Sequence, residues 1–262
     1  MPSSLEWRLH FEHNALTLLE IPWQFGEELT AAEKSAIGRS LAEFQAGESS
    51  EGKHLHRFAR EYAERTGDHE YLVAIRVFIA EEQRHGRDLG RFLTLNGIPL
   101  VRTTFADRVF RKLRRFLGGL ESSIAVLIVA EIIAKVYYAA IRDATESRVL
   151  RRLCEQILQD EEAHVRFQAE QLATLRRGRG RIAHVLTMAA QRFLFDGTVL
   201  VVWWAHRRAV RKGGLSFARW WRGCRREFVV AFPRRSARPV TLVARPSADA
   251  ARSAPEAAAE RA

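Results

Sequence analysis

Residues 71–92, YLVAIRVFIAEEQRHGRDLGRF, form an apolar stripe that two ionisable residues interrupt. Apolar side chains recur here at intervals of three or four positions, which is typical of a helix with one buried face. Glu82 and His85 occupy positions on that stripe. Charged side chains are seldom fully buried unless they are paired or bind a metal. The segment therefore predicts a core helix, from about 69 to 95, that carries a Glu-x-x-His pair on its buried face.

A second Glu-x-x-His pair, Glu161 and His164, lies on the stripe of a helix predicted from about 147 to 176. Residues three apart share one face of a helix, so each pair aims a carboxylate and an imidazole at one point. A further predicted helix, from about 121 to 145, carries Glu131 at a stripe position. A single Glu-x-x-His match means little by itself. The interpretation rests on the register of these residues with the apolar stripes.

The first predicted helix, from about 31 to 66, offers two carboxylates between its apolar positions, Glu48 and Glu51. Glu48 precedes Glu82 by 82 − 48 = 34 residues, and Glu131 precedes Glu161 by 161 − 131 = 30 residues. Counting back from the turn after this helix favours Glu51 instead. The residues alone leave both open. The chain also contains His54, which we interpret as a histidine of the helix surface.

The predicted organisation is all-α, with a helical bundle as its main part. Thr30 and Glu33 match a capping box at the start of the first bundle helix. A long connection, with a short basic helix at 107–117, separates the second and third bundle helices and suits a crossover. The predicted regions are an irregular N-terminal segment (1–29), a four-helix bundle (30–177), a basic, Trp-rich helical extension (178–232) with helices at 182–212 and 215–230, and a disordered tail (233–262).

Two details refine this organisation. Trp7, Leu9 and Phe11 alternate with polar residues, which suggests a short extended piece laid on the bundle. Residues 124–141 approach the length of a membrane span, but Glu131 and Lys135 near their middle favour a buried core helix. The apolar run at 199–205 is too short to span a membrane.

Composition favours a cytoplasmic globular protein. The chain has 262 residues, of which 47% are hydrophobic, and only two cysteines, Cys154 and Cys224. Two cysteines do not make a disulfide framework, so a reducing compartment fits. The first residues lack a basic region followed by an apolar run, which indicates no signal peptide.

Positive charge is concentrated in the C-terminal third. Residues 176–262 hold 19 Lys/Arg and 5 Asp/Glu, a balance of 19 − 5 = +14, whereas residues 1–175 hold 23 and 26, a balance of −3. Such a segment is either a solvated face or a surface for an anionic partner. The region 176–235 therefore suits contact with RNA or with an anionic membrane, which would make the protein peripheral to it. Four tryptophans in this region fit core packing or the wall of a substrate channel: Trp203, Trp204, Trp220 and Trp221.

The donor types on the stripes favour a site for two metal ions. Carboxylate oxygens and neutral imidazole nitrogens suit iron, manganese or zinc. Four carboxylates neutralise two divalent ions and can bridge them. The stripes carry no thiolate, which argues against a cysteine-rich zinc site. A pair of Glu and Glu-x-x-His sets on four helices is the ligand set of a two-metal carboxylate bundle.

Four motifs resemble the ferritin-like di-iron carboxylate superfamily over residues 30–172: FQAGE at 44–48, EEQRH at 81–85, Glu131 in VAEII, and DEEAH at 160–164. FQAGE is similar to a motif of ribonucleotide reductase small subunits and their ligand-binding oxidase relatives, in which the last Glu binds metal. The resemblance therefore favours Glu48 over Glu51. Asp160 is similar to an aspartate that orients a ligand histidine in several members. Tyr138 is expected near the site, without a clear match to the radical tyrosine of the reductases.

This resemblance implies a ferritin-like bundle and two iron ions, with manganese or a mixed Mn/Fe pair as alternatives. The implied activity is that of an O2-activating oxidase or oxygenase that hydroxylates, desaturates or N-oxidises a small-molecule or carrier-bound substrate. An external ferredoxin or flavoprotein would supply electrons, and a homodimer is compatible with this class. Two alternatives stay open: an iron-handling ferroxidase, and a hydroxylase that reaches RNA, a membrane or a carrier through its basic C-terminal helices.

Overall fold

The structure, a computed structural model, describes residues 2–49, 52–101 and 118–233, and all their regular structure is helical, so the all-α prediction is confirmed. The described residues from Pro2 to Phe232 belong to one compact unit. In chain order the elements are α1 (Ser4–Leu16), the 3-10 turn η1 (Trp23–Phe25), α2 (Ala31–Glu33), the π turn η2 (Lys34–Gly38), α3 (Arg39–Glu48), α4 (Lys53–Thr66), α5 (His69–Leu95), α7 (Gly119–Asp143), α8 (Arg148–Leu175), α9 (Arg181–Lys212) and α10 (Phe217–Ala231).

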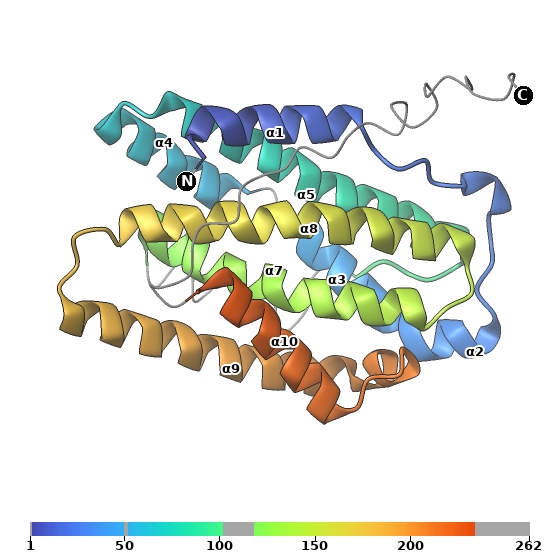
Figure 1. Ribbon diagram of the computed structural model, residues 1–262. Helices are drawn as coiled ribbons and strands as arrows, with labels where there is room; N and C mark the ends of the chain where they lie inside the picture. Colours follow the sequence, from blue (N-terminus) through green and yellow to red (C-terminus); the bar gives the residue numbers. More distant parts are fainter. Residues whose placement is uncertain (1, 50–51, 102–117, 234–262) are drawn as a thin grey trace, which may run out of the picture. The chain divides into compact units, whose positions relative to one another are not determined.

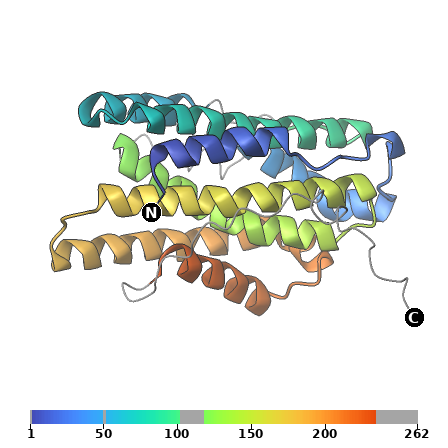
Figure 2. The same ribbon diagram turned by 45° about the horizontal axis from the view of Figure 1, so that its top comes forward.

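Helices α3, α4, α5, α7 and α8 surround the core (Figure 1). The short connection between α7 and α8 makes them antiparallel neighbours, as expected for helices joined by a few residues. Helix α5 packs against α3, α4 and α8, while α9 and α10 pack against α7. Figures 1 and 2 both place α1 on the opposite side of the α7–α8 pair from α9. The apolar faces predicted from the sequence therefore meet in one core.

The prediction of one continuous helix over 31–66 is wrong. Its start is right, because Thr30 and Glu33 form the capping box. The π turn η2 and α3 follow, and α3 ends at Glu48. Helix α4 begins only at Lys53, directly after Gly52, whose φ is +62°. A Cβ at Gly52 would lie 2.8 Å from side-chain atoms of Ile79 on α5. The left-handed backbone and the close approach of α5 both require glycine. The apolar periodicity of the sequence predicts neither feature.

The prediction of an irregular segment over 1–29 is wrong for its first half. Helix α1 begins at Ser4, after Ser3, which caps it and forms a capping box with Glu6. Trp7 and Phe11 are buried one helical turn apart, and the Trp7 ring nitrogen donates a hydrogen bond to Glu170 on α8 at 2.9 Å. The alternation of Trp7, Leu9 and Phe11 suggested a short extended piece, but the four-residue spacing of Trp7 and Phe11 fits a helix equally well.

The C-terminal helices are confirmed as α9 and α10. Trp203 and Trp220 are buried, with their ring centroids 6.4 Å apart, so these two tryptophans serve packing. Trp204, in contrast, is exposed. The short helix predicted at 107–117 and residues 234–262 of the predicted tail lie outside the described residues.

Two described helices, α7 and α9, are long and apolar enough to cross a membrane by length and composition alone. The most apolar window of α7 is 67% buried inside the structure, as a core helix would be, whereas that of α9 is 28% buried. The apolar run at 199–205, expected to be too short to span, is part of the much longer α9. These two helices are weak indications of a membrane protein, and a soluble protein is compatible with them.

Candidate metal centre

Six predicted residues converge inside the bundle from four helices: Glu48 (α3), Glu82 and His85 (α5), Glu131 (α7), and Glu161 and His164 (α8). They form two overlapping groups. Glu48, Glu82, His85 and Glu161 make one group, and Glu82, Glu131, Glu161 and His164 make the other. Within each group, one donor atom per residue lies within 4.8 Å of every other. Glu82 and Glu161 belong to both groups, so the cluster has the connectivity of two adjoining cation sites.

Several donor atoms of the cluster are buried without a hydrogen-bond partner among the described residues. They are Glu82 Oε1, His85 Nδ1, both carboxylate oxygens of Glu161, and His164 Nδ1. The atoms nevertheless lie close together: His164 Nδ1 is 2.9 Å from Glu82 Oε1 and 4.0 Å from Glu161 Oε2. Buried polar atoms normally have partners, because an unmade hydrogen bond leaves the full cost of removal from water. The cluster can hold a metal ion, which would supply the missing partner for all of these atoms.

The buried carboxylates repel one another. Burial raises the pKa of Glu82 well above its usual range, and the charges on Glu131 and Glu48 raise it further. Burial likewise raises the pKa of Glu161, reinforced by Glu131 and Glu82. Bound divalent cations would relieve this repulsion and keep the carboxylates ionised. Four carboxylates balance the charge of two such ions.

Each cluster histidine is held by a carboxylate from the opposite helix. His85 Nε2, on α5, lies 2.8 Å from Asp160 Oδ2 on α8, and His164 Nε2, on α8, lies 3.0 Å from Glu81 Oε2 on α5. The ring nitrogen that remains on each histidine is the Nδ1 atom that faces the cluster. A carboxylate behind a metal-binding histidine fixes its ring orientation and raises its basicity. The position expected for Asp160 is therefore confirmed.

Glu81 is a site residue that the sequence reasoning missed. The signal was available, because Glu81 and Asp160 each stand immediately before the Glu of a Glu-x-x-His pair. The two segments repeat the pattern acid-Glu-x-x-His, and in the structure each acid contacts the histidine of the other segment. On a helix the preceding residue is turned about 100° from its neighbour, so it reaches across to the adjacent helix.

Asn14 of α1 bridges Glu81 and Asp160, the two carboxylates that contact the cluster histidines. Its side-chain nitrogen donates to Glu81 Oε1 at 2.5 Å and to Asp160 Oδ1 at 2.7 Å. Arg84 adds a hydrogen bond to Asp160 Oδ2 at 2.5 Å. Burial opposes ionisation of Asp160, but the hydrogen bond from His85 and the positive charge of Arg84 outweigh it and lower its pKa. The N-terminal helix therefore contributes a polar residue to the support of the site.

The cluster carboxylates on α3 and α7 are also held in place. Tyr138 donates a hydrogen bond to Glu48 Oε1 at 2.7 Å, and Gln168 Nε2 donates to Glu131 Oε1 at 3.1 Å. Burial raises the pKa of Tyr138 well above its usual range, so the phenol keeps its proton. The expectation that Tyr138 lies near the site is confirmed.

The structure places Glu48 in the cluster, as one of the two alternatives predicted. Glu51 lies outside the described residues. His54 is exposed on α4, in agreement with its interpretation as a surface histidine.

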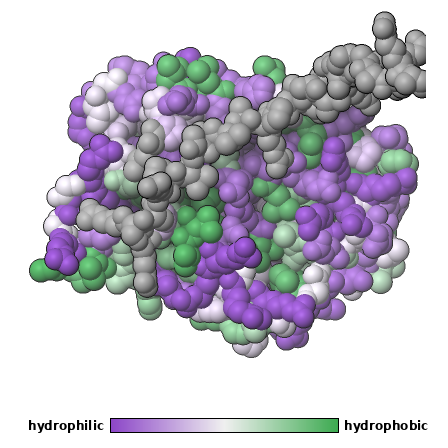
Figure 3. Space-filling view, viewed as in Figure 1, coloured by the Kyte–Doolittle hydropathy of each residue, from purple (hydrophilic) through white to green (hydrophobic). Residues whose placement is uncertain are grey.

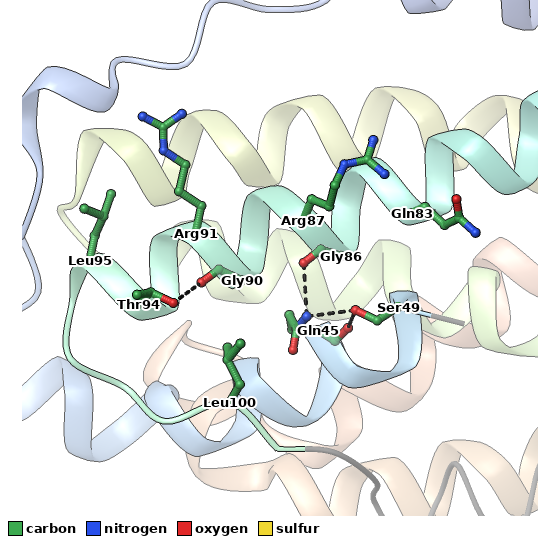
Figure 4. A pocket seen from close by; sticks show the side chains of 10 residues that line it. All are labelled: Gln45, Ser49, Gln83, Gly86, Arg87, Gly90, Arg91, Thr94, Leu95 and Leu100. Carbon is green, nitrogen blue, oxygen red and sulfur yellow. Dashed lines mark hydrogen bonds between the residues drawn. The ribbon is translucent and has the colours of Figure 1, made fainter. Parts of the chain in front are cut away.

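A pocket of about 570 Å³ opens beside the cluster, between α3 and α5 (Figure 4). Gln45 and Ser49 form one side of it, and Gly86 and Gly90 on α5 form another. Gln45 Nε2 donates to the Gly86 carbonyl oxygen at 3.1 Å. Ser49 follows the cluster residue Glu48 in the chain, and Gly86 follows His85. None of the six cluster residues lines the pocket.

Gly86 is required for this arrangement. A Cβ at Gly86 would lie 2.7 Å from Ser49 Oγ and 3.1 Å from the Ser49 backbone nitrogen. The missing side chain lets α3 approach α5 closely enough for Glu48 to join the residues of α5.

Comparison with protein-family models, with curated proteins and with solved structures finds no match to this chain.

Proposed function

We propose that the buried cluster binds two iron ions and that the protein is an oxidoreductase of the ferritin-like di-iron class, an oxidase or oxygenase that uses O2. The observation that carries the proposal is the shared use of Glu82 and Glu161 by two donor groups, each completed by one histidine and one further carboxylate. This is the donor set of two-metal carboxylate bundles. Manganese, alone or with iron, suits the same donors.

Bound iron would supply redox chemistry and O2 activation that the side chains lack. The chain itself would supply four things. Six side chains hold the ions. Asp160 and Glu81 keep the histidine rings oriented with Nδ1 toward the cluster. Tyr138 and Gln168 fix one oxygen each of Glu48 and Glu131, which leaves the second oxygen of each carboxylate for a metal. The surrounding core excludes water, because the cluster residues except Glu82 are buried.

The pocket between α3 and α5 is the proposed approach for a small substrate. It lies next to the cluster, and a substrate in it would meet Gln45, Ser49 and the α5 backbone before the metal ligands. The electron donor is proposed by class only, as a ferredoxin or flavoprotein. A cytoplasmic location is part of the same proposal.

The test is the metal content of the purified protein after anaerobic incubation with ferrous iron, followed by the absorbance change when O2 is admitted. We expect about two irons per chain and a spectral change that consumes O2. Glu131→Ala should lose at least one iron and keep its helical circular dichroism. Folded protein that binds neither iron nor manganese would overturn the proposal, and oxidation of many irons per chain would replace the oxygenase by a ferroxidase.

A further inference from the structure

Helix α9 presents a long apolar stripe to solvent. Its exposed residues recur along one face, and several are highly exposed, with 78% for Ile182, 84% for Phe193 and 66% for Trp204. The other members are Val185, Leu186, Leu200 and Val201. Figure 3 shows apolar residues at the lower left, where α9 begins in Figure 1. From Ile182 to Trp204 the stripe extends for about 33 Å at 1.5 Å per residue. We call this surface the α9 face.

Within the described part of the chain, the residues of this stripe do not contribute to the packed core. The opposite side of α9 is the one that packs inward, through Phe195, Val199 and Val202. A soluble surface seldom leaves so many large apolar side chains together without a partner. Because the inner side of α9 packs in the protein core, only the outer face of this helix can contact a partner.

Positive charge surrounds the stripe at both ends. Arg177 and Arg181 are exposed before it, and Arg207, Arg208 and Arg211 are exposed after it. Arg207 lies over the ring of Trp204, with its guanidinium carbon 5.1 Å from the ring centroid. The single acidic residue of α9, Asp196, is paired with Arg192 at 2.8 Å. The α9 face is therefore apolar along its length and cationic at its ends.

We propose that the α9 face lies flat on an anionic lipid bilayer, with α9 in the plane of the interface. An amphipathic helix binds in this way when apolar side chains enter the boundary of the acyl chains and basic residues meet anionic headgroups. Trp204 beside Arg207 fits that boundary, where tryptophan and arginine are favoured. The helix cannot cross the bilayer while its inner side packs on α7. The proposal is independent of the metal centre.

Charge disfavours a second copy of the chain as the occupant. If two α9 faces met, the basic end of one would oppose a basic end of the other in either orientation. Like charges brought together at an interface oppose association. An anionic membrane surface satisfies both features of the face, its apolar stripe and its basic ends.

The first test uses one engineered thiol. The two native cysteines, Cys154 and Cys224, are fully buried, so a thiol introduced at an exposed site will react selectively with a maleimide. In the full chain, Phe193→Cys should react rapidly in buffer and become strongly protected by phosphatidylserine-containing vesicles. Leu16→Cys is the matched control, because Leu16 is 85% exposed on α1. It should react equally with and without vesicles.

The second test is vesicle flotation of the full chain. The protein should float with phosphatidylserine-containing vesicles and much less with phosphatidylcholine alone. Phe193→Asp should weaken partitioning by about 10- to 100-fold, the worth of burying one Phe side chain. Leu16→Asp should change little. Removal of one exposed arginine, as in Arg211→Ala, should cost about fivefold.

Four results would overturn the proposal. The first would be failure of the protein to float with anionic vesicles, and the second would be an equal loss of flotation in the Leu16→Asp control and in Phe193→Asp. The third would be an unreactive Phe193→Cys in dilute, lipid-free protein, which would mean that another part of the chain covers the α9 face. The fourth would be protection of Phe193→Cys as protein concentration rises without lipid, which would assign the face to a second copy.

Discussion

Glu161→Gln tests whether the buried cluster is a metal centre, because this residue serves both donor groups. Both of its carboxylate oxygens are buried and unpartnered among the described residues. The substitution preserves shape and removes the charge. Without metal it should be tolerated or stabilising at neutral pH. Burial and Glu131 raise the pKa of Glu161 above 4.5, so its contribution to stability is lost as pH rises through the folded-state pKa.

With metal, the expectation has the opposite sign. A ligand at 100 times its dissociation constant stabilises the folded state by about 2.7 kcal/mol for each site. In a domain of this size, 1 kcal/mol shifts the Tm by about 2–4 °C, so one filled site should raise the Tm of the wild type by about 5–11 °C. Glu161→Gln weakens both donor groups at once, so most of that rise should disappear.

The assay is thermal unfolding followed by far-UV circular dichroism, in chelator and in excess Mn(II), which does not react with air as ferrous iron does. Glu162→Gln is the matched control, since the adjacent carboxylate is 69% exposed and pairs with Lys135 rather than with the cluster. It should keep the full metal-dependent shift. If Glu161→Gln gained as much from Mn(II) as the wild type, or if Glu162→Gln lost the shift equally, the cluster would not be the metal site.

Three further predictions follow from single contacts. Asn14→Ala should lower metal affinity by about 10- to 100-fold, measured by isothermal titration, because Asn14 supports both carboxylates behind the histidines; an unchanged affinity would limit Asn14 to a packing role. Gly86→Ala should destabilise the protein to urea by about 1–3 kcal/mol, since its Cβ would lie 2.7 Å from Ser49 Oγ. Gly47→Ala, with nothing within 4 Å of its Cβ, should be neutral or stabilising, and equal losses would refute the steric reasoning. Burial lowers the pKa of His206 from 6.5 to about 4. The contribution of His206 to the free energy of unfolding should therefore be complete above pH 6.5 and fall by up to about 3 kcal/mol as pH drops toward 4. In urea titrations, His206→Gln should reduce this fall.

Helix periodicity is a local property, so the sequence determined the long core helices and which acidic and histidine side chains they carry toward the core. Helix α5 spans His69–Leu95, as its stripe predicts, and Glu82 and His85 both reach the cluster because the register of one helix fixes their direction. The same holds for Glu131 on α7 and for Glu161 on α8. A charged residue at a core position was a reliable signal, since burial without a partner is costly.

Contacts between distant segments were decided only by the tertiary structure. The break at Gly52 depends on the approach of Ile79 from another helix, which periodicity does not record. Asn14 contacts residues 67 and 146 positions away, so nothing near it in the chain marks it as part of the site. The exposed face of α9 likewise follows from which side of that helix packs on α7. An apolar sequence indicates that a helix face tends to be buried, but only the packing of the whole chain decides which face stays exposed.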